Sequence, residues 1–319
     1  MRKWLQRLLP LADALLVPLV YPAAALLKGI RRVGVQRLPR CRSALLDVGV
    51  FPLRDHYYEP QFDFRADAEQ LTRERELPGI DWNVPGQLAL LERFTFATEL
   101  AGIPQGRTAT RSFHFDNGSF EAGDAEYWYQ FIRTLKPRRL IEIGSGNSTL
   151  MAIAALTRNS GEDPGYRCDH VCIEPYEAPW LEQTGVTVVR SKVEDLAPAF
   201  FARLEANDVL FIDSSHVIRP HGDVLFEFLE LLPRLNPGVY VHVHDIFSPR
   251  HYLERWLTED VRFWNEQYLL EAFLSHNASW RVVGALNYLH HHHYERLAAV
   301  APYLTPERAP GSFYLQKVA

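Results

Sequence analysis

The residues best suited to chemistry lie in the stretch 142–149, which reads Glu-Ile-Gly-Ser-Gly-Asn-Ser-Thr. Ile141 and Ile143 favour a buried strand before the turn, and the apolar spacing over 150–156 favours a helix after it. Gly144 and Gly146 let the backbone turn sharply and approach a ligand closely. A helix that begins directly after such a turn directs free backbone N–H groups into the crevice above a parallel sheet, where cofactors bind in open α/β folds.

The neighbours of the two glycines indicate which kind of cofactor fits. A dinucleotide fingerprint would place a third glycine at position 149, where this chain has Thr149. Its absence argues against close packing on a pyrophosphate, and Glu142 would set a carboxylate beside a diphosphate. A cationic or zwitterionic cofactor would accept that carboxylate. An ordinary strand-to-helix turn without a ligand is the alternative.

Carboxylates also stand at the ends of successive expected strands, where ligands of open α/β sheets bind. They are Glu142, Glu174, Asp213 and Asp245. Glu174 follows Gly146 by 28 residues, a place from which a carboxylate can accept both hydroxyls of a ribose. A solvated loop carboxylate is the alternative there. Glu194 comes after the third expected strand and is placed to reach an adenine amino group, whereas helix capping by the adjacent Asp195 explains that pair equally well.

Alternating strands and helices must position these residues. We expect strands at 139–143, 170–174, 186–190, 208–213 and 239–245, and helices at 87–100, 124–135, 147–157, 196–205 and 223–232. A long helix over 251–274, a strand at 280–286, a helix at 294–300 and a strand at 312–318 complete the order. The alternation requires a parallel sheet with helices on both faces, an α/β, doubly wound fold closed by a terminal pair of strands. We expect three regions: an apolar segment at 1–35, a cap or arm at 36–110, and the main domain at 111–319.

Composition narrows the function classes. The chain has 319 residues, 47% of them hydrophobic and 23% charged, as in an ordinary globular protein. A net charge of −5 gives no reason to expect binding to nucleic acid. Cys41, Cys168 and Cys172 are too few and too scattered for a disulfide framework or a zinc site, which favours a reducing compartment, the cytoplasm.

The N-terminal segment Leu8 to Leu27 is almost wholly apolar and has basic residues on both sides. Its twenty residues are long enough to span a bilayer, but Asp13 and three prolines at 10, 18 and 22 weaken a stable span. The basic flanks favour a segment that lies on the anionic inner leaflet of the membrane. A packed helix of a soluble protein and a true span are the alternatives.

Four segments carry a resemblance to a known family. They are Glu142-Ile-Gly-Ser-Gly-Asn-Ser-Thr149, Ile173-Glu174-Pro175, Phe211-Ile-Asp-Ser-Ser-His216 and His242-Val-His-Asp-Ile-Phe247. Together they resemble successive motifs of class I S-adenosylmethionine-dependent methyltransferases, most closely a bacterial branch related to small-molecule and sugar O-methyltransferases. The resemblance covers about residues 110–319. It implies a Rossmann-like, seven-stranded sheet that is mostly parallel with an antiparallel C-terminal strand.

The resemblance also implies a cofactor, S-adenosylmethionine (SAM), and the residues that hold it. Glu142, Gly144 and Gly146 would frame its methionine part, and Glu174 would bind its ribose. The cofactor-binding residues expected on this basis are Glu142, Gly144, Ser145, Gly146, Asn147, Ser148, Glu174, Glu194 and Asp213.

The reaction implied is in-line methyl transfer, in which the protein aligns the nucleophile and removes its proton. Two arrangements of Asp213, His216, His244 and Asp245 would do this. In one, Asp213 and Asp245 hold Mg²⁺, which lowers the pKa of a substrate hydroxyl. In the other, His216 or His244 is the general base. Related metal-dependent enzymes have an acidic or amide residue beside the strand-five aspartate, whereas here the neighbours are His244 and Ile246. A hydrogen-bonded structural cluster is the third interpretation.

The acceptor is expected to be a small molecule, a sugar, or a glycan- or lipid-linked hydroxyl. Trp264, Tyr268 and the aromatics at 57–64 are candidates for an acceptor wall, although aromatics four apart on a helix are also typical of a core. Two other functions are weighed against methyl transfer: an NAD(P)-dependent oxidoreductase on the same sheet, and a non-catalytic cofactor-binding module.

Overall fold

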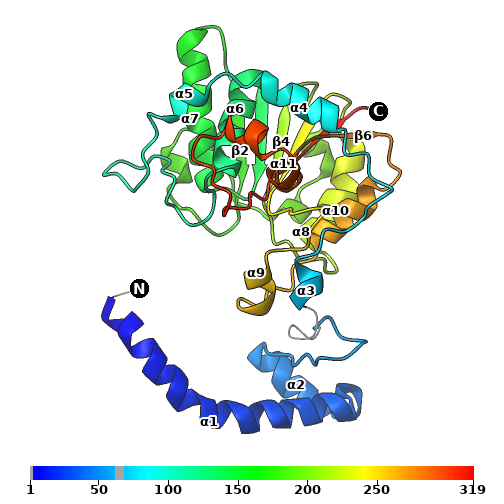
Figure 1. Cartoon of the computed structure of the whole chain (residues 1–319). Coiled ribbons are helices and arrows are strands. Elements are labelled where there is room, and N and C mark those ends of the chain that lie inside the picture. The colour runs from blue at the N-terminus through cyan, green and yellow to red at the C-terminus, as the bar shows by residue number, and fades with distance from the viewer. Residues whose placement is uncertain (1–2, 62–67) are drawn as a thin grey trace. The chain divides into compact units, whose positions relative to one another are not determined.

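The computed structural model describes residues 3–61 and 68–319, and the chain divides into two compact units, residues 1–67 and 68–319 (Figure 1). The boundary falls inside the segment 36–110 that the sequence indicates as one arm. Residues 68–110 therefore belong to the same unit as the sheet, and α4 (Val84–Glu92) contacts its edge strand β6 (Trp280–Ala285).

The larger unit is built on one seven-stranded sheet in the order β3-β2-β1-β4-β5-β7-β6. The first five strands in sequence pair in parallel, and β7 runs antiparallel to both of its neighbours. The chain moves outward from β1 to β3 and then crosses back to β4, so the strand order reverses beside β1. The expected α/β fold, mostly parallel with an antiparallel C-terminal strand, is confirmed.

The remaining strands and helices of this unit follow in chain order. The strands are β1 (Arg139–Ile143), β2 (Asp169–Ile173), β3 (Thr187–Val189), β4 (Val209–Ile212), β5 (Tyr240–Val243) and β7 (Phe313–Lys317). The helices are α3 (Ala68–Leu71), α5 (Ala97–Leu100), α6 (Asp124–Leu135), α7 (Asn147–Glu162), α8 (Asp223–Phe226), α9 (Glu254–Thr258), α10 (Glu266–Leu274), α11 (Leu286–His292) and α12 (Tyr294–Ala298).

Each face of the sheet buries its own apolar cluster. Successive residues of β4 alternate between them: Phe211 joins the cluster under α6 and α7, and Leu210 and Ile212 join the cluster under α8 and α10. The same alternation on β5 directs His242 towards Trp128 and Tyr314 on the first face. The strands are therefore held from both sides, and their carboxyl ends form one fixed edge.

The helix predicted over 251–274 is wrong as a single element. The chain forms α9 and α10 with a loop over 259–265 between them, and Val261 in that loop has a φ of 51°. A β-branched residue in the left-handed region cannot continue a helix. The helix expected at 87–100 is likewise two helices, α4 and α5. Over 196–205 only a short 3₁₀ turn forms, from Pro198 to Phe201.

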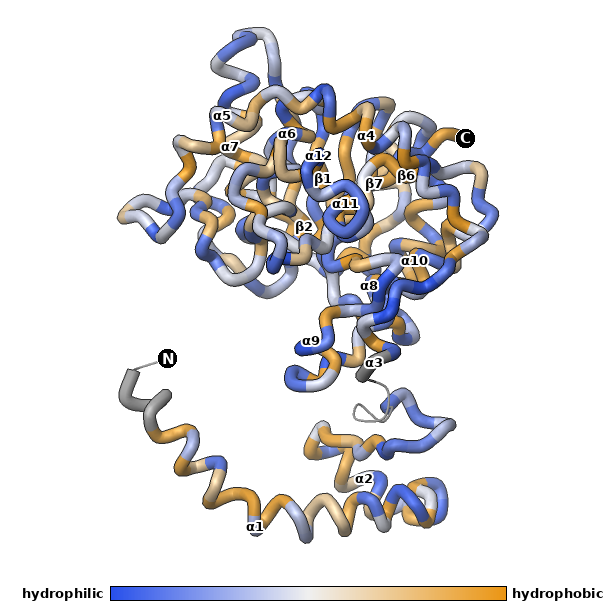
Figure 2. The backbone as a smooth tube through the Cα atoms, viewed as in Figure 1, coloured by the Kyte–Doolittle hydropathy of each residue, from blue (hydrophilic) through white to orange (hydrophobic). Residues whose placement is uncertain are grey.

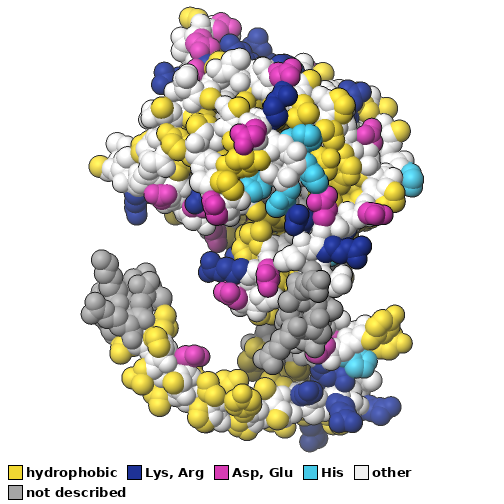
Figure 3. Space-filling view, viewed as in Figure 1, with side chains coloured by type: hydrophobic (Ala, Val, Ile, Leu, Met, Phe, Trp, Pro, Cys, Tyr) yellow, Lys and Arg dark blue, Asp and Glu magenta, His cyan; other side chains and the backbone are white. Residues whose placement is uncertain are grey.

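The smaller unit consists of a long helix, α1 (Lys3–Val33), a 3₁₀ turn (Val35–Arg37), α2 (Pro39–Val48) and an irregular segment. Pro10, Pro18 and Pro22 lie inside α1, which bends along its length (Figure 1). Apolar residues occupy long stretches of this helix (Figure 2), and basic side chains gather at its C-terminal end (Figure 3). Residues 8–33 are long and apolar enough to cross a membrane by length and composition, and none of that stretch is buried.

The packing of α6 on the sheet gives a first prediction. Trp128 is fully buried, with its ring against Phe211 and His242 at centroid distances of 5.3 Å each. Trp128→Ala would leave a cavity there and should lower the free energy of unfolding by about 3–5 kcal/mol. Chemical denaturation measures the loss. Leu229→Ala, at a side chain that is 59% exposed, is the matched control and should change stability by less than about 0.5 kcal/mol. Equal losses in the two variants would contradict the packing described.

Candidate active site

The glycine loop between β1 and α7 is shaped by a close approach to the next strand. Gly144 has a φ of +76°, and a Cβ there would lie 1.9 Å from the carbonyl oxygen of Asp213. Only glycine meets both conditions. Two backbone hydrogen bonds join the end of β1 to the ends of its neighbours β2 and β4. The Gly144 amide donates to the Ile173 carbonyl (3.0 Å), and the Asp213 amide donates to the Ile143 carbonyl (2.9 Å). The carboxyl ends of β1, β2 and β4 thus meet at the start of α7.

Glu142 holds the glycine loop through hydrogen bonds to the start of α7. Its side chain is fully buried and accepts hydrogen bonds from Ser148 Oγ (2.9 Å) and Thr149 Oγ1 (3.1 Å) at the start of α7. Its other oxygen lies 2.5 Å from His170 Nε2 on β2. Glu142 lines neither of the two cavities at this edge of the sheet. It therefore positions the loop, and a direct contact with a cofactor stays a prediction.

Glu174 lies directly after β2 and faces both cavities. Its side chain accepts backbone N–H groups from Tyr176 (3.0 Å) and Glu177 (2.8 Å), and a longer contact joins it to the Ser145 amide (3.4 Å). These bonds hold the carboxylate beside the glycine loop. Such a carboxylate can accept a pair of neighbouring hydroxyls.

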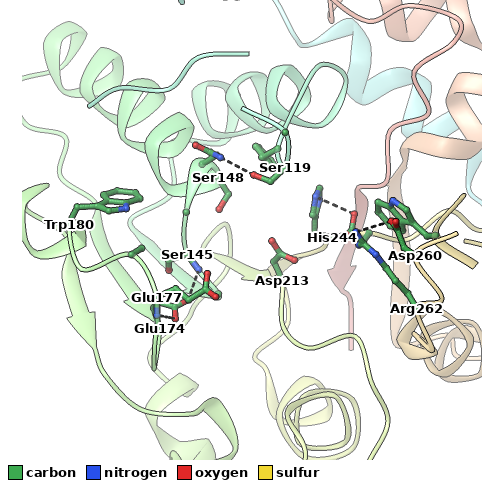
Figure 4. A pocket seen from close by; sticks show the side chains of 18 of the residues that line it. Ser119, Ser145, Ser148, Glu174, Glu177, Trp180, Asp213, His244, Asp260 and Arg262 are labelled. Carbon is green, nitrogen blue, oxygen red and sulfur yellow. Dashed lines mark hydrogen bonds and ion pairs between the residues drawn. The ribbon is translucent and has the colours of Figure 1, made fainter. Parts of the chain in front are cut away.

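Two cavities open along the carboxyl edge of the sheet. The first, of about 780 Å³, extends from the glycine loop to α9 and the loop after it (Figure 4). The second, of about 590 Å³, lies towards β3 and includes Glu194. The two share Gly144, Glu174, Glu177 and Asp213, so they are parts of one groove. Chief among the residues that line the first cavity are Ser119, Phe120, Gly144, Ser145, Gly146, Asn147, Ser148, Glu174, Trp180, Asp213, His244, Asp245, Trp256, Asp260 and Arg262.

The four residues predicted for catalysis lie together at the ends of β4 and β5. His216 Nε2 lies 3.2 Å from Asp213 Oδ1 and 3.6 Å from Asp245 Oδ2. His244 Nε2 lies 3.6 Å from Asp245 Oδ1. Asp213, His244 and Asp245 line the first cavity. His216 lines neither cavity, and the centroid of its ring lies 4.2 Å from that of Trp264.

The two histidines differ in their surroundings. Burial by itself lowers the pKa of His216, but hydrogen bonds to Asp213 and Glu266 raise that pKa well above its ordinary value. His216 Nδ1 lies 2.7 Å from the fully buried Glu266, so a carboxylate stands beside each ring nitrogen and favours the protonated form. Burial also lowers the pKa of His244, and the charges of Asp245, Asp213 and Asp124 outweigh that effect and raise it moderately.

The same cluster could hold a metal ion. One ligand atom each from Asp213, His216 and Asp245 lies within 4.8 Å of the others. The second ring nitrogen of His216 bonds to the Glu266 carboxylate, as metal-bound histidines commonly do. Two carboxylates suit Mg²⁺ or Mn²⁺, whereas the imidazole suits a borderline metal such as Zn²⁺. The donor set therefore fits a divalent ion, with His216 as a ligand that the sequence analysis did not assign.

Trp264 and Tyr268, for which an acceptor wall and a core position were both open, take packed positions. Trp264 packs on His216, and Tyr268 bonds to His251 (2.9 Å); neither lines the two cavities. Trp256 and Arg262 line the first cavity instead. The guanidinium of Arg262 lies 4.4 Å from the Trp256 ring and 4.5 Å from the Trp264 ring, and pairs with Asp260 at 3.5 Å.

Other aromatics of that expected wall belong elsewhere. Tyr57 and Tyr58 are in the smaller unit, and Phe62 and Phe64 lie outside the described residues. Trp256, Asp260 and Arg262 were missed because a continuous helix was expected over them. The left-handed Val261 that breaks this helix leaves no signal in the sequence.

Part of the sequence is similar to known proteins. Residues 141–246 match the family model described as a methyltransferase domain. An uncharacterized protein of Archaeoglobus fulgidus is 29% identical over 171 residues, which cover 50% of this chain and 75% of that protein.

Solved structures with a distant likeness include three methyltransferases. The O-methyltransferase TomG from Streptomyces achromogenes, in complex with SAM, is 16% identical, with 80% of this chain and 95% of that chain covered and a TM-score of 0.37. The O-methyltransferase from Bacillus cereus, in complex with SAH, is 13% identical, with 72% and 90% covered and a TM-score of 0.36. Apo CalS11, a TDP-rhamnose 3′-O-methyltransferase, is 13% identical, with 76% and 99% covered and a TM-score of 0.37. TM-scores this low add no argument, so the assignment depends on the family match. That match assigns a methyltransferase domain to residues 141–246, and the sheet order and the glycine loop are those that the resemblance to class I SAM-dependent methyltransferases implies.

Proposed function

We propose that this enzyme transfers a methyl group from SAM to a hydroxyl oxygen of a small-molecule or sugar acceptor. The observation that carries the proposal is the single groove that joins Glu174, the glycine loop and the cluster of Asp213, His244 and Asp245. SAM supplies a methyl group that is already activated on a sulfonium. The protein therefore has to bind both molecules, align them and remove one proton.

Cofactor binding is assigned to the β3 side of the groove. Glu174 accepts the two ribose hydroxyls, and Glu194 faces the cavity beyond it, where an adenine would lie. The first turn of α7 directs its backbone N–H groups towards the groove and suits the carboxylate of the methionine part. Hydrogen bonds to His216 outweigh burial and keep the pKa of Asp213 below its ordinary value, so this carboxylate balances a sulfonium charge.

Proton removal is assigned to His244. Its ring lines the cavity next to Asp213 and Asp245, and Nδ1 lies 3.4 Å from Ser312 Oγ. His216 is a poor base in this arrangement because the surrounding carboxylates hold it as a cation. The alternative is a divalent ion on Asp213, His216 and Asp245, which would lower the pKa of the acceptor hydroxyl directly.

The acceptor is assigned to the part of the cavity beyond Asp213. Trp256 offers an aromatic face there, while Asp260 and Arg262 offer hydrogen-bonding groups beside it. An apolar face next to paired polar groups suits the two sides of a sugar ring.

We also infer that the enzyme works in the cytoplasm, next to the inner face of the membrane. Its three cysteines are free, as expected in a reducing compartment. The exposed apolar helix α1 and its basic C-terminal end support the membrane-facing position.

Replacing the ribose carboxylate tests the cofactor assignment. Glu174→Gln removes a charged acceptor, and the affinity for S-adenosylhomocysteine should fall about 10- to 100-fold. Titration calorimetry measures this fall, with an unchanged melting temperature of the free protein as the check on folding. NADH should not bind to the unmodified protein. Tight NADH binding without S-adenosylhomocysteine binding would favour an oxidoreductase instead.

The proton-transfer assignment predicts a pH dependence. The base must be neutral to accept a proton, and the pKa of His244 is raised, so activity should increase as the pH rises through the neutral range. His244→Gln should lower kcat by about 10²- to 10⁴-fold and remove this dependence. Initial rates from pH 6 to 9 test both effects.

Chelation separates the two arrangements of the cluster. With His244 as the base, EDTA leaves the rate unchanged. The metal arrangement predicts that EDTA abolishes activity and that Mn²⁺ or Mg²⁺ restores it. It also predicts that His216→Gln lowers the affinity for the ion that restores activity. These three results together would replace the histidine base by a metal ion.

A further inference from the structure

The smaller unit holds most of the large hydrophobic side chains that are exposed in the described part of the chain. Among the described residues, 21 large hydrophobic side chains are exposed, and 18 of them lie between Leu8 and Tyr58. Leu15 and Leu19, one turn apart on α1, are 68% and 66% exposed. Exposed apolar patches of this extent mark a surface that binds a partner or a membrane.

The part of this unit that the structure describes also lacks a core. Over residues 8–61, none of the side chains is buried. An isolated apolar helix in water is marginal, and most helical stability comes from burying one face. The apolar side chains of α1 therefore need a cover that the described residues of this unit do not provide.

A second apolar group follows the first along the chain. Leu46 and Val48 at the end of α2, and Val50 and Phe51 just after it, are all exposed. The chain thus presents apolar side chains from α1, and again from the end of α2 and the segment beyond.

Basic residues occupy the stretch between these two apolar groups. They are Lys28, Arg31, Arg32, Arg37, Arg40 and Arg42. Arg31 pairs with Glu59 at 2.7 Å, and its guanidinium lies 5.0 Å from the Phe51 ring, so the returning segment is tied to the end of α1. Residues 1–60 contain ten Lys or Arg and four Asp or Glu, a net charge of +6, whereas the whole chain carries −5.

We propose that residues 8–58 form a membrane-binding arm that inserts its apolar side chains into one leaflet and holds its basic residues on anionic phospholipid headgroups. Apolar side chains flanked by Lys and Arg are the pattern of interfacial segments, and each basic residue adds attraction to an anionic surface. The proposal deepens the location inferred under the proposed function and does not depend on methyl transfer.

Attachment to one leaflet fits the arm better than a span does. Asp13 and three prolines lie within the apolar stretch of α1. Basic residues stand on both sides of that stretch, and a span would place one of these groups on the far side of the membrane. The second apolar group, beyond the basic stretch, would be left in water by a span of α1 alone.

Flotation of the purified full-length protein with preformed vesicles tests the proposal. We expect co-flotation with vesicles of phosphatidylcholine and 30% phosphatidylglycerol, little with phosphatidylcholine alone, and weaker binding in high salt. Arg37→Glu, Arg40→Glu and Arg42→Glu combined should weaken binding more than about tenfold. The matched control, Arg107→Glu, Arg158→Glu and Arg281→Glu, makes the same change in net charge at exposed arginines of the larger unit and should leave binding within about twofold.

A second variant tests the apolar side chains. Leu15→Glu with Leu19→Glu should abolish flotation, while Leu229→Glu, at an exposed leucine of the larger unit, should not. S-adenosylhomocysteine binding by every variant shows that the larger unit is folded, so a failure of this proposal is distinguishable from a failure of the methyltransferase assignment.

Three results would overturn the proposal. One is no flotation with either vesicle. Another is dissociation of a dimer by the double leucine variant without any vesicle binding, which would show that a second copy covers α1. The third is retention of the native protein in cell membranes after alkaline carbonate extraction, which would show a span; release by carbonate supports the arm.

Discussion

The site depends on the close approach between the glycine loop and the end of β4. The backbone at Gly144 passes so near the Asp213 carbonyl that a Cβ would overlap it. This contact exists because β1 pairs with β2 on one side and with β4 on the other. The strand order of the sheet therefore reverses beside β1. The contact brings Gly144 in the glycine loop and Asp213 after β4 to one point, although they are 69 residues apart in sequence. A groove that crosses this point can hold two reacting molecules end to end.

The pKa values of the buried groups at this edge of the sheet depend on two opposing effects, burial and the charge of neighbouring side chains. Burial alone would neutralise the histidines and protonate the carboxylates. Burial lowers the pKa of His216, but hydrogen bonds to Asp213 and Glu266 outweigh it and raise that pKa well above its ordinary value. His242, on the same strand as His244, shows the opposite outcome: burial and repulsion from His244 hold its pKa well below the ordinary value. Its ring packs on Tyr314 at 4.3 Å, so this histidine belongs to the core.

Sequence reasoning succeeded where a local pattern was sufficient. The β1–turn–α7 unit and the strand-end positions of Glu174, Asp213 and Asp245 follow from short-range periodicity, and the expected fold is confirmed. It failed where tertiary context decides. The loop over 259–265 carries a helical pattern, yet it folds onto the 213–218 segment through hydrogen bonds from the Asn265 and Glu266 amides to the His216 carbonyl. The buried partner of His216, Glu266, could be named only after that contact was known.

Contacts run from this loop to the cluster without interruption. Trp256 packs on Arg262, Arg262 on Trp264, and Trp264 on the His216 ring. A molecule resting against Trp256 would therefore press on a stack that ends at the imidazole between Asp213 and Asp245. The far wall of the first cavity and the ends of β4 and β5 therefore belong to one packed set, and a substitution at Trp256 would reach the His216 ring through only two intervening side chains.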